Sequence, residues 1–353
     1  MYTYRLTAMY VPVVDRNNQP LMPAKKCRAR RWVKSGKATP FYKRGVWCVR
    51  LNVEPSARNT QPIAVGIDPG SKREGLTVKA AHSTFLNIQA HAVDWVKEAV
   101  STRRNMRRAR RYRKTPCRLN RYNRLRNKTG LAPSTKARWQ WKLRLCWWLK
   151  KLYPITAFIV EDIKAVTKGK RRWDVMFSPL EIGKKWLYIE LAKLGEVITK
   201  QGYETKELRE QYGLKKSKNK LASDFSAHCV DSWVLANWYV GGHTKPDNTK
   251  LLIVIPLQFH RRQLHRLQYA TGHIRPRYGG TISASFKRGS LVKHPKYGLC
   301  YVGGFRDSPT KKQPSRQVVS LHCLSTGKRL TQNTLPADLK FLAYNSWRVV
   351  DGK

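Results

Sequence analysis

Acidic residues are scarce in this chain, and three of them stand where they could act together. Of 353 residues, only 21 are Asp or Glu, against 71 Lys or Arg. Asp68 ends a short β-branched run, Glu161 ends a later apolar run, and Asp231 follows His228 by three residues. Residues three apart share one side of a helix. Three carboxylates beside an imidazole have the composition of a two-metal site that hydrolyses phosphodiesters.

These side chains need a scaffold that brings them together, and the order of the predicted elements offers one. Three consecutive strands precede a helix, a further buried strand and later helices; the strands are expected at residues 63–67, 75–80, 85–92 and 157–160. This is the order of the ribonuclease H fold, an α/β fold in which the first strand lies beside the later one. Asp68 and Glu161 then end side by side, and a helix capped by Ser223 or Asp224 presents His228 and Asp231 to them.

The cofactor that suits such a site is Mg²⁺, as two ions, with Mn²⁺ as a substitute. Mg²⁺ prefers hard carboxylate oxygens, which Asp68, Glu161 and Asp231 would provide. His228 would position or deprotonate the attacking water, because an imidazole titrates near neutral pH. The seven cysteines are dispersed and form no CxxC pair, so we expect neither a zinc site nor a disulfide framework.

Each of these residues also has a simpler interpretation. Asp68 lies in Asp-Pro-Gly, a common turn sequence, and His228 could be an ordinary core or surface histidine. Asp231 could pair with one of the many arginines. Asp162, directly after Glu161, could be the acidic ligand in its place. Only the joint occurrence of the acids, in this order and on these elements, favours a nuclease site.

The formal charge of +50 points to nucleic acid as the partner. With 41% hydrophobic residues and 12 Trp the chain is expected to fold, unlike a disordered basic tail. Residues 101–128 hold 13 Lys or Arg and no acid, and we expect a helix whose cations contact phosphates. The candidate phosphate contacts there are Arg103, Arg104, Arg107, Arg108, Arg110, Arg111, Arg113, Lys114, Arg118, Arg121 and Arg124.

Other segments carry weaker patterns. Residues 135–153 are expected to form an amphipathic helix with Trp139, Leu143, Cys146 and Trp147 on one side. Residues 203–208 are a weak strand candidate. After Gly241-Gly242, short apolar runs separated by Gly and Pro predict a separate β-rich domain that begins with a strand at 251–255. No apolar run is long enough to span a membrane, and the N-terminus lacks the pattern of a signal peptide.

Three motifs together resemble those of RuvC-like nucleases. They are Gly66-Ile67-Asp68-Pro69-Gly70-Ser71-Lys72, Ile159-Val160-Glu161-Asp162 and His228-Cys229-Val230-Asp231-Ser232. The arginine-rich stretch resembles the bridge helix of type II CRISPR effectors and their transposon-borne ancestors. Pro20-Leu21-Met22-Pro23 resembles the PLMP domain that marks the IscB and IsrB group. Residues 162–227 contain no His and no Cys, so an HNH nuclease cannot lie there, and the chain resembles the RuvC-only IsrB family.

The resemblance implies a division of the chain into five parts. A PLMP domain would span residues 1–60, RuvC part I 61–100, the bridge helix 101–130, RuvC parts II and III 131–245, and a β-rich domain that interacts with the target-adjacent motif 246–353. It also implies an RNA-guided nickase that binds a long ωRNA and double-stranded target DNA and cuts the non-target strand. We expect a protein monomer within a ribonucleoprotein, located in the prokaryotic cytoplasm at the nucleoid and not at a membrane.

Two other functions are compatible with the same motifs. One is a RuvC-type nuclease that cuts DNA junctions without a guide, and the other is an inactive RNA-binding scaffold. The long arginine-rich stretch disfavours the first, and the intact set of acids disfavours the second. Within the β-rich domain, base-edge contacts to the adjacent motif are expected from Arg, Lys, Gln or Asn side chains. The candidates are Arg261, Arg262, Gln263, Arg275 and Arg277.

Overall fold

The structure is a computed structural model that describes residues 9–113, 131–162, 179–219, 221–258, 273, 282–310 and 313–352. Some sequence predictions lie outside these residues: the phosphate contacts Lys114, Arg118, Arg121 and Arg124, and the adjacent-motif candidates Arg261, Arg262, Gln263, Arg275 and Arg277. No helix in the described ranges is both long and apolar enough to cross a membrane.

The N-terminal module is a small sheet covered by one helix. Its strands run in the order β2-β1-β4-β3, and Ala29 of the helix is fully buried against them. The prolines of the Pro20–Pro23 segment fall on β2, an edge strand, where a missing N–H is tolerated. The elements are β1 (Tyr10–Val14), β2 (Pro20–Lys25), α1 (Lys26–Lys34), β3 (Ala38–Lys43) and β4 (Val46–Leu51).

The central sheet contains the arrangement predicted for a ribonuclease H fold, in which the fourth predicted strand lies beside the first. Strands β5, β6 and β7 pair antiparallel, and β8 pairs parallel with β5 and β9 with β8, in the full order β18-β10-β7-β6-β5-β8-β9. The strands are β5 (Ile63–Asp68), β6 (Arg73–Ala80), β7 (Ser83–His91), β8 (Ala157–Asp162), β9 (Glu196–Gln201), β10 (Leu251–Pro256) and β18 (Trp347–Asp351).

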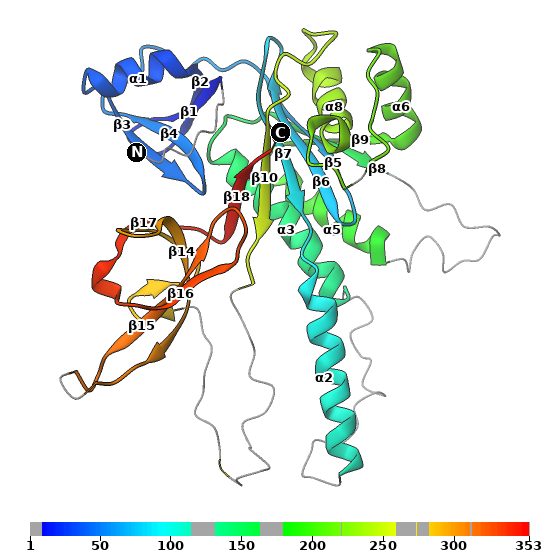
Figure 1. The fold of residues 1–353 in the computed structure, drawn as a ribbon. Coiled ribbons are helices and arrows are strands. Elements are labelled where there is room, and N and C mark those ends of the chain that lie inside the picture. Colours follow the sequence, from blue (N-terminus) through cyan, green and yellow to red (C-terminus); the bar gives the residue numbers. More distant parts are fainter. Residues whose placement is uncertain are drawn as a thin grey trace.

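Helices cover both faces of this sheet (Figure 1). Side chains alternate between the faces of a strand, so Ile63, Val65 and Ile67 of β5 pack with α3 (Pro133–Lys150) and α5 (Pro179–Ala192). Ala64 faces the other way and packs with α8 (Val230–Val240). The small side chains on that second face let α8 lie close to the strands.

Residues 203–208 are helical, so the predicted strand there is wrong. They lie in α6 (Gly202–Gln211), which follows the edge strand β9. A capping box starts this helix: the Glu204 side chain accepts a 2.6 Å hydrogen bond from the Gln201 backbone N–H. The short apolar pattern of residues 203–208 does not show that Gln201 and Glu204 form a helix cap.

The arginine-rich helix begins earlier than predicted. Helix α2 runs from Trp95 to Tyr112 and extends away from the central sheet (Figure 1). Its first turn contributes Trp95 and Val96 to the main core, which anchors a helix whose remaining length is arginine-rich and has no buried residue. In α3, Trp139 and Cys146 are buried as predicted, whereas Trp147 is 45% exposed, because the buried side is formed instead by Trp141, Leu145 and Trp148.

The predicted start of the C-terminal domain is also incorrect in one respect. Strand β10 pairs with β7, and β18, near the end of the chain, pairs with β10, so both belong to the central sheet. Between them lies a second sheet in the order β16-β15-β14-β13-β17, with a short hairpin β11-β12. Its elements are β11 (Ile282–Ser283), β12 (Phe286–Lys287), β13 (Ser290–His294), β14 (Gly298–Asp307), β15 (Gln317–Cys323), β16 (Arg329–Thr334), the 3₁₀ turn η1 (Pro336–Asp338) and β17 (Lys340–Tyr344).

A buried ion pair joins α3 to the sheet, and we predict that it is required for stability. Lys142 Nζ lies 2.6 Å from Glu74 Oε1, and both side chains are almost fully buried. Burial raises the pKa of Glu74, and the Lys142 ammonium opposes this. Lys142→Met leaves the carboxylate without this cation and is expected to lower the free energy of unfolding by about 3–5 kcal/mol. Urea unfolding at pH 7 measures the change.

The control is the double variant Lys142→Met with Glu74→Gln, which carries no charge at either position and is expected to regain most of the loss. The defect of the single variant should also shrink as the pH falls toward 4.5, the ordinary pKa of glutamate, because the folded state then binds the proton more tightly than the unfolded chain. A single variant as stable as the double variant at pH 7 would contradict the role of the pair.

Candidate active site

The two strand-end carboxylates meet at one edge of the central sheet. Residues Ile67 and Val160 are paired in register between β5 and β8, so Asp68 and Glu161 follow at neighbouring positions. The Asp68 carboxyl group acts directly on that of Glu161 and raises its pKa. Asp68 and Glu161, predicted from separate motifs, are therefore in direct contact.

Helix α8 brings the third carboxylate to this edge because two glycines let it approach the sheet. A Cβ on Gly66 would lie 1.8 Å from the Ser232 carbonyl oxygen, and one on Gly75 would lie 1.7 Å from that of His228. The hydroxyl groups of Thr77 and Ser232 then hydrogen-bond at 2.9 Å. No side chain larger than hydrogen fits at Gly66 without moving α8, or at Gly75 without moving the His228 backbone that leads into it.

The segment before α8 is held by a cap and a short helix. Asp224 Oδ1 accepts a 2.7 Å hydrogen bond from the Ala227 N–H at the start of α7 (Phe225–His228). Asp224, rather than Ser223, is thus the cap. The chain continues through Cys229 into α8, so Asp231 lies in the first turn of that helix, 2% exposed.

Two cations that sequence reasoning missed neutralise the cluster. Lys216 Nζ bridges Asp68 Oδ2 at 2.9 Å and Asp231 Oδ2 at 2.5 Å. Arg209 Nη1, from α6, lies 2.6 Å from Asp231 Oδ1. Neither residue belongs to one of the three motifs, and Arg209 follows the segment predicted to be a strand. The only feature of the sequence that could have indicated a role for these two cations was their position between the second and third motifs.

The electrostatics of the cluster are concentrated on Glu161. Burial, followed by the neighbouring Asp68 and Asp231, raises the pKa of Glu161 to about 8. The nearby Lys216 acts in the opposite direction. The two carboxylates in turn raise the pKa of the Lys216 ammonium against the effect of burial. Strong mutual perturbation of buried ionisable groups is typical of functional sites.

The geometry separates Glu161 from Asp162, the alternative that the sequence left open. Successive residues of a strand point to opposite faces. Glu161 contacts Asp68, whereas Asp162 Oδ1 lies 2.8 Å from Lys184 Nζ, which also pairs with Glu181 at 2.9 Å. Asp162 is therefore engaged with α5, and Glu161 is the acid that faces the cluster.

His228 is buried on α7, and its backbone carbonyl packs over Gly75. Its charge acts on His91, whose pKa is lowered mainly by burial, then by Arg73 and Arg348 and also by His228. His228 is the last residue of α7, whereas Asp231 lies in the first turn of α8, so the single helix predicted to carry both residues is two helices.

The donor chemistry of the cluster suits a hard divalent cation, because its acidic groups are carboxylates. Among the described residues, however, no three His, Cys, Asp or Glu side chains are spaced as a ready set of metal ligands. In this conformation Lys216 supplies the positive charge between Asp68 and Asp231. The three acids are Asp68, Glu161 and Asp231, and these are the residues that would hold Mg²⁺.

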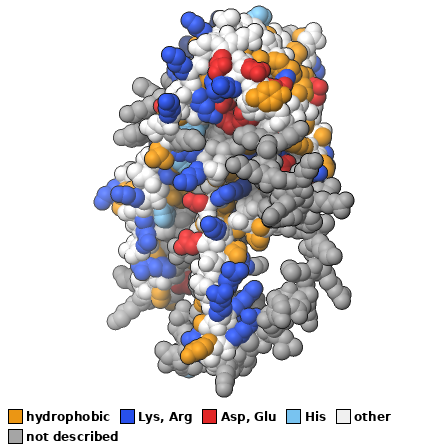
Figure 2. Space-filling view, turned by 90° about the vertical axis from the view of Figure 1, so that its right-hand side faces the viewer, with side chains coloured by type: hydrophobic (Ala, Val, Ile, Leu, Met, Phe, Trp, Pro, Cys, Tyr) orange, Lys and Arg blue, Asp and Glu red, His pale blue; other side chains and the backbone are white. Residues whose placement is uncertain are grey.

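The described part of the arginine-rich helix forms a basic surface. Arginines of α2 line a recess of about 510 Å³ together with Val100 and Pro133; they are Arg103, Arg104, Arg107, Arg108 and Arg111. Arg110 and Arg113 continue the helix and its C-terminal cap, and Tyr112 is 89% exposed. Lys and Arg side chains spread over the visible face of the molecule from top to bottom (Figure 2).

Comparison with known proteins found similarity to a protein family and to solved structures. Residues 11–171 match the model of the RRXRR protein family, a segment that contains the N-terminal module, Asp68, α2 and Glu161. A search of curated proteins found no match. Among solved structures, T. thermophilus RuvC in complex with a Holliday junction substrate is similar, with 12% identity, 52% of this chain and 98% of that chain covered, and a TM-score of 0.29.

If these carboxylates hold Mg²⁺, the raised pKa of Glu161 predicts that the affinity for the ion depends on pH. Below pH 8 the metal-free protein holds a proton on this carboxyl group, and a metal must displace it. The apparent affinity is therefore expected to rise by up to about tenfold per pH unit as the pH approaches 8, and to level off above it. Calorimetric titration with Mg²⁺ at pH 6.5, 7.5 and 8.5 measures both affinity and, with two buffers, proton release.

Glu161→Gln is the control for this titration. It should bind Mg²⁺ more weakly and release no proton from this position, while Asp162→Asn should keep the pH dependence. A Glu161→Gln protein with an unchanged pH profile would show that another group controls binding.

Proposed function

We propose that this protein is an RNA-guided DNA endonuclease of the RuvC type that nicks the non-target strand. The observation that carries the proposal is the convergence of Asp68, Glu161 and Asp231 at one edge of a sheet with ribonuclease H strand order. The match of residues 11–171 to the RRXRR family, which is linked to RuvC-like nucleases, supports it.

The cluster has the groups that phosphodiester hydrolysis needs. Asp68, Glu161 and Asp231 would hold two Mg²⁺ ions, or Mn²⁺ in their place. Bound Mg²⁺ supplies Lewis-acid charge that activates water and stabilises the leaving oxygen of a phosphodiester. Lys216 and Arg209 offset the repulsion among the carboxylates, so their arrangement exists before nucleic acid arrives. His228 would act on the water as a general base or orienting group.

Guidance by RNA is supported by the charge and by the arginine-rich helix. A guided nuclease reads sequence through base pairing and itself holds the heteroduplex by its shape and phosphates. A net charge of +50 on 353 residues and the arginine recess of α2 suit that task. The partners would be a long ωRNA and double-stranded DNA, and the choice of the non-target strand follows from the resemblance to IsrB.

The test begins with sequencing of the RNA that copurifies with the protein, followed by nicking of a supercoiled plasmid that carries the matching target. Asp68→Ala is expected to lower the nicking rate by more than about 100-fold, since metal-assisted charge stabilisation contributes several kcal/mol. RNA and target binding should stay within about twofold of the wild type. Glu207→Gln, an exposed acid on α6, is the control.

The alternatives give different results in the same assay. Cleavage of four-way junctions by RNA-free protein would support a guide-independent junction nuclease. Stable RNA binding without cleavage in either Mg²⁺ or Mn²⁺ would support an inactive scaffold. An Asp68→Ala protein that nicks at the wild-type rate would overturn the site itself.

A further inference from the structure

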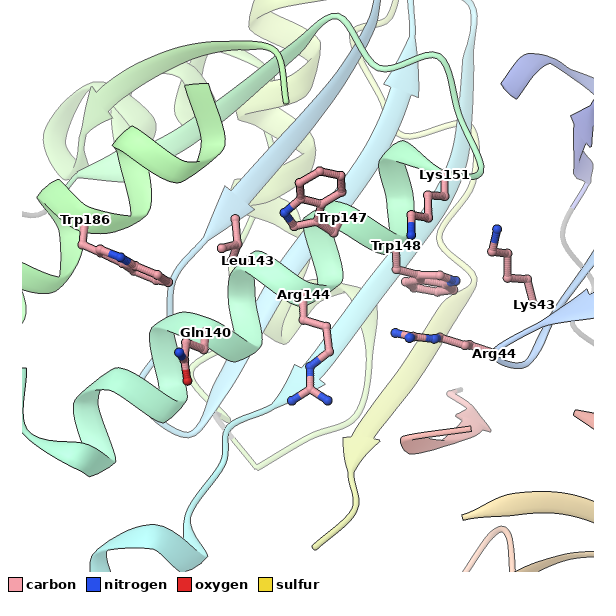
Figure 3. A pocket seen from close by; sticks show the side chains of 9 residues that line it. All are labelled: Lys43, Arg44, Gln140, Leu143, Arg144, Trp147, Trp148, Lys151 and Trp186. Carbon is pink, nitrogen blue, oxygen red and sulfur yellow. The ribbon is translucent and has the colours of Figure 1, made fainter. Parts of the chain in front are cut away.

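A pocket of about 520 Å³ lies outside the carboxylate cluster, between the N-terminal module and two helices of the central domain (Figure 3). Lys43 and Arg44 enter it from the β3–β4 turn, Arg144 and Trp147 from α3, and Trp186 from α5. A cavity of this size is in the range of sites that hold one small organic ligand. The chemistry of its lining determines which ligand it could hold.

The lining is strongly cationic. Its charged side chains are Lys43, Arg44, Arg144 and Lys151, and no described lining residue is acidic. Burial lowers the pKa of Lys43, and the Lys151 charge lowers it further; Arg44 is affected in the same way by burial and Arg144. Four cations thus face a common space where they repel one another, which costs free energy that an anion would recover.

The pocket also exposes aromatic surface. Trp147 is 45% exposed although its neighbours Cys146 and Trp148 on α3 are buried. Figure 3 shows its ring on the same side of α3 as Lys151, with Trp186 across from it on α5. A large exposed indole beside several cations offers a flat face for stacking together with charge for a phosphate.

The backbone at Arg44 is unusual and directs its side chain here. Arg44 and Gly45 form a two-residue hairpin turn with φ values of 52° and 94°. Such turns favour Asn-Gly, because side chains other than Asn, Asp or Gly are strained at positive φ. An arginine is present instead, and its guanidinium carbon lies 4.4 Å from the centre of the Trp347 ring. In Figure 3 it reaches toward Trp148, which itself packs edge-on against Trp347.

The turn is fixed in place before any ligand binds. A Cβ on Gly45 would lie 2.7 Å from Val349 Cγ2, so the turn rests directly on β18. Arg44 therefore projects from a turn fixed on the central sheet and not from a loose loop. A site that is already ordered loses little conformational entropy when its ligand arrives.

We propose that this pocket binds an unpaired nucleotide of a single strand, with the base stacked on Trp147 and the phosphate held by Arg44 and Arg144. Lys43 and Lys151 complete the positive lining. The proposal depends on the proposed function only for the class of partner, since both concern nucleic acid. Single-stranded RNA and single-stranded DNA share the required chemistry, and the experiment separates them.

The first experiment measures binding of fluorescein-labelled 12-mers, as RNA and as DNA, to the RNA-free full-length protein by anisotropy. Trp147→Ala is expected to weaken binding about tenfold, the loss of one base–aromatic stack, and Trp147→Phe to restore most of it. With oligomers of abasic residues, Trp147→Ala should have no effect. The strand type that shows the larger effect is the ligand.

Arg44→Asn is the second variant, chosen because it suits the turn. Asn is favoured at this position, so the protein should be as stable as the wild type in thermal unfolding and still bind about fivefold more weakly. Arg28→Asn, which removes an exposed charge from α1, is the matched control for net charge. Strands that contain 5-iodouridine should crosslink to the peptide containing Trp147 on irradiation.

Unchanged affinity in both Trp147→Ala and Arg44→Asn would overturn the nucleotide site, as would an equal effect of Trp147→Ala on normal and abasic strands. Tighter binding of an acidic peptide than of either oligomer, lost in the same variants, would also overturn it in favour of a protein partner. These results are independent of cleavage, because the nicking assay with Asp68→Ala tests the proposed function separately.

Discussion

The close approach of α8 to β5 and β6 is the constraint on which the site depends. Asp231 reaches Asp68 and Glu161 only because Gly66 and Gly75 leave room for the backbone of the helix. That approach places three carboxylates in a mostly buried space, where burial and then repulsion from Asp68 and Asp231 raise the pKa of Glu161 to about 8. Lys216 and Arg209 form ion pairs that offset the repulsion among the carboxylates. Helix packing therefore brings the acids together, and these ion pairs stabilise the cluster that results.

Cations in the interior and cations at the surface differ in whether they have acidic partners. Where cations are needed by the fold they have partners, as Lys142 has in Glu74 and Lys184 in Asp162 and Glu181. The pocket beside Trp147 and the recess of α2 are different, because cations crowd there and no described lining residue is acidic. With a net charge of +50, the unmatched cations gather where a polyanion can reach them.

The sequence predicted the acids better than their surroundings. Strand order alone placed Asp68 beside Glu161, since parallel neighbours end at the same edge. It could not choose between Glu161 and Asp162, because that depends on which face α5 covers. Lys216 and Arg209 were missed since a cation's partner is set by tertiary contact, and Arg209 lies in a helix whose cap was not recognised.

Longer-range errors have a similar origin. Strands β10 and β18 read as part of a C-terminal β-rich domain, yet they extend the central sheet, because edge pairing cannot be read from a local pattern. This pairing has a consequence for the pocket. Val349 of β18 lies against Gly45, so the end of the chain fixes the turn that carries Arg44. Two segments about 300 residues apart in the chain thus fix the position of the Arg44 side chain. This position depends on the pairing of β18 with the central sheet.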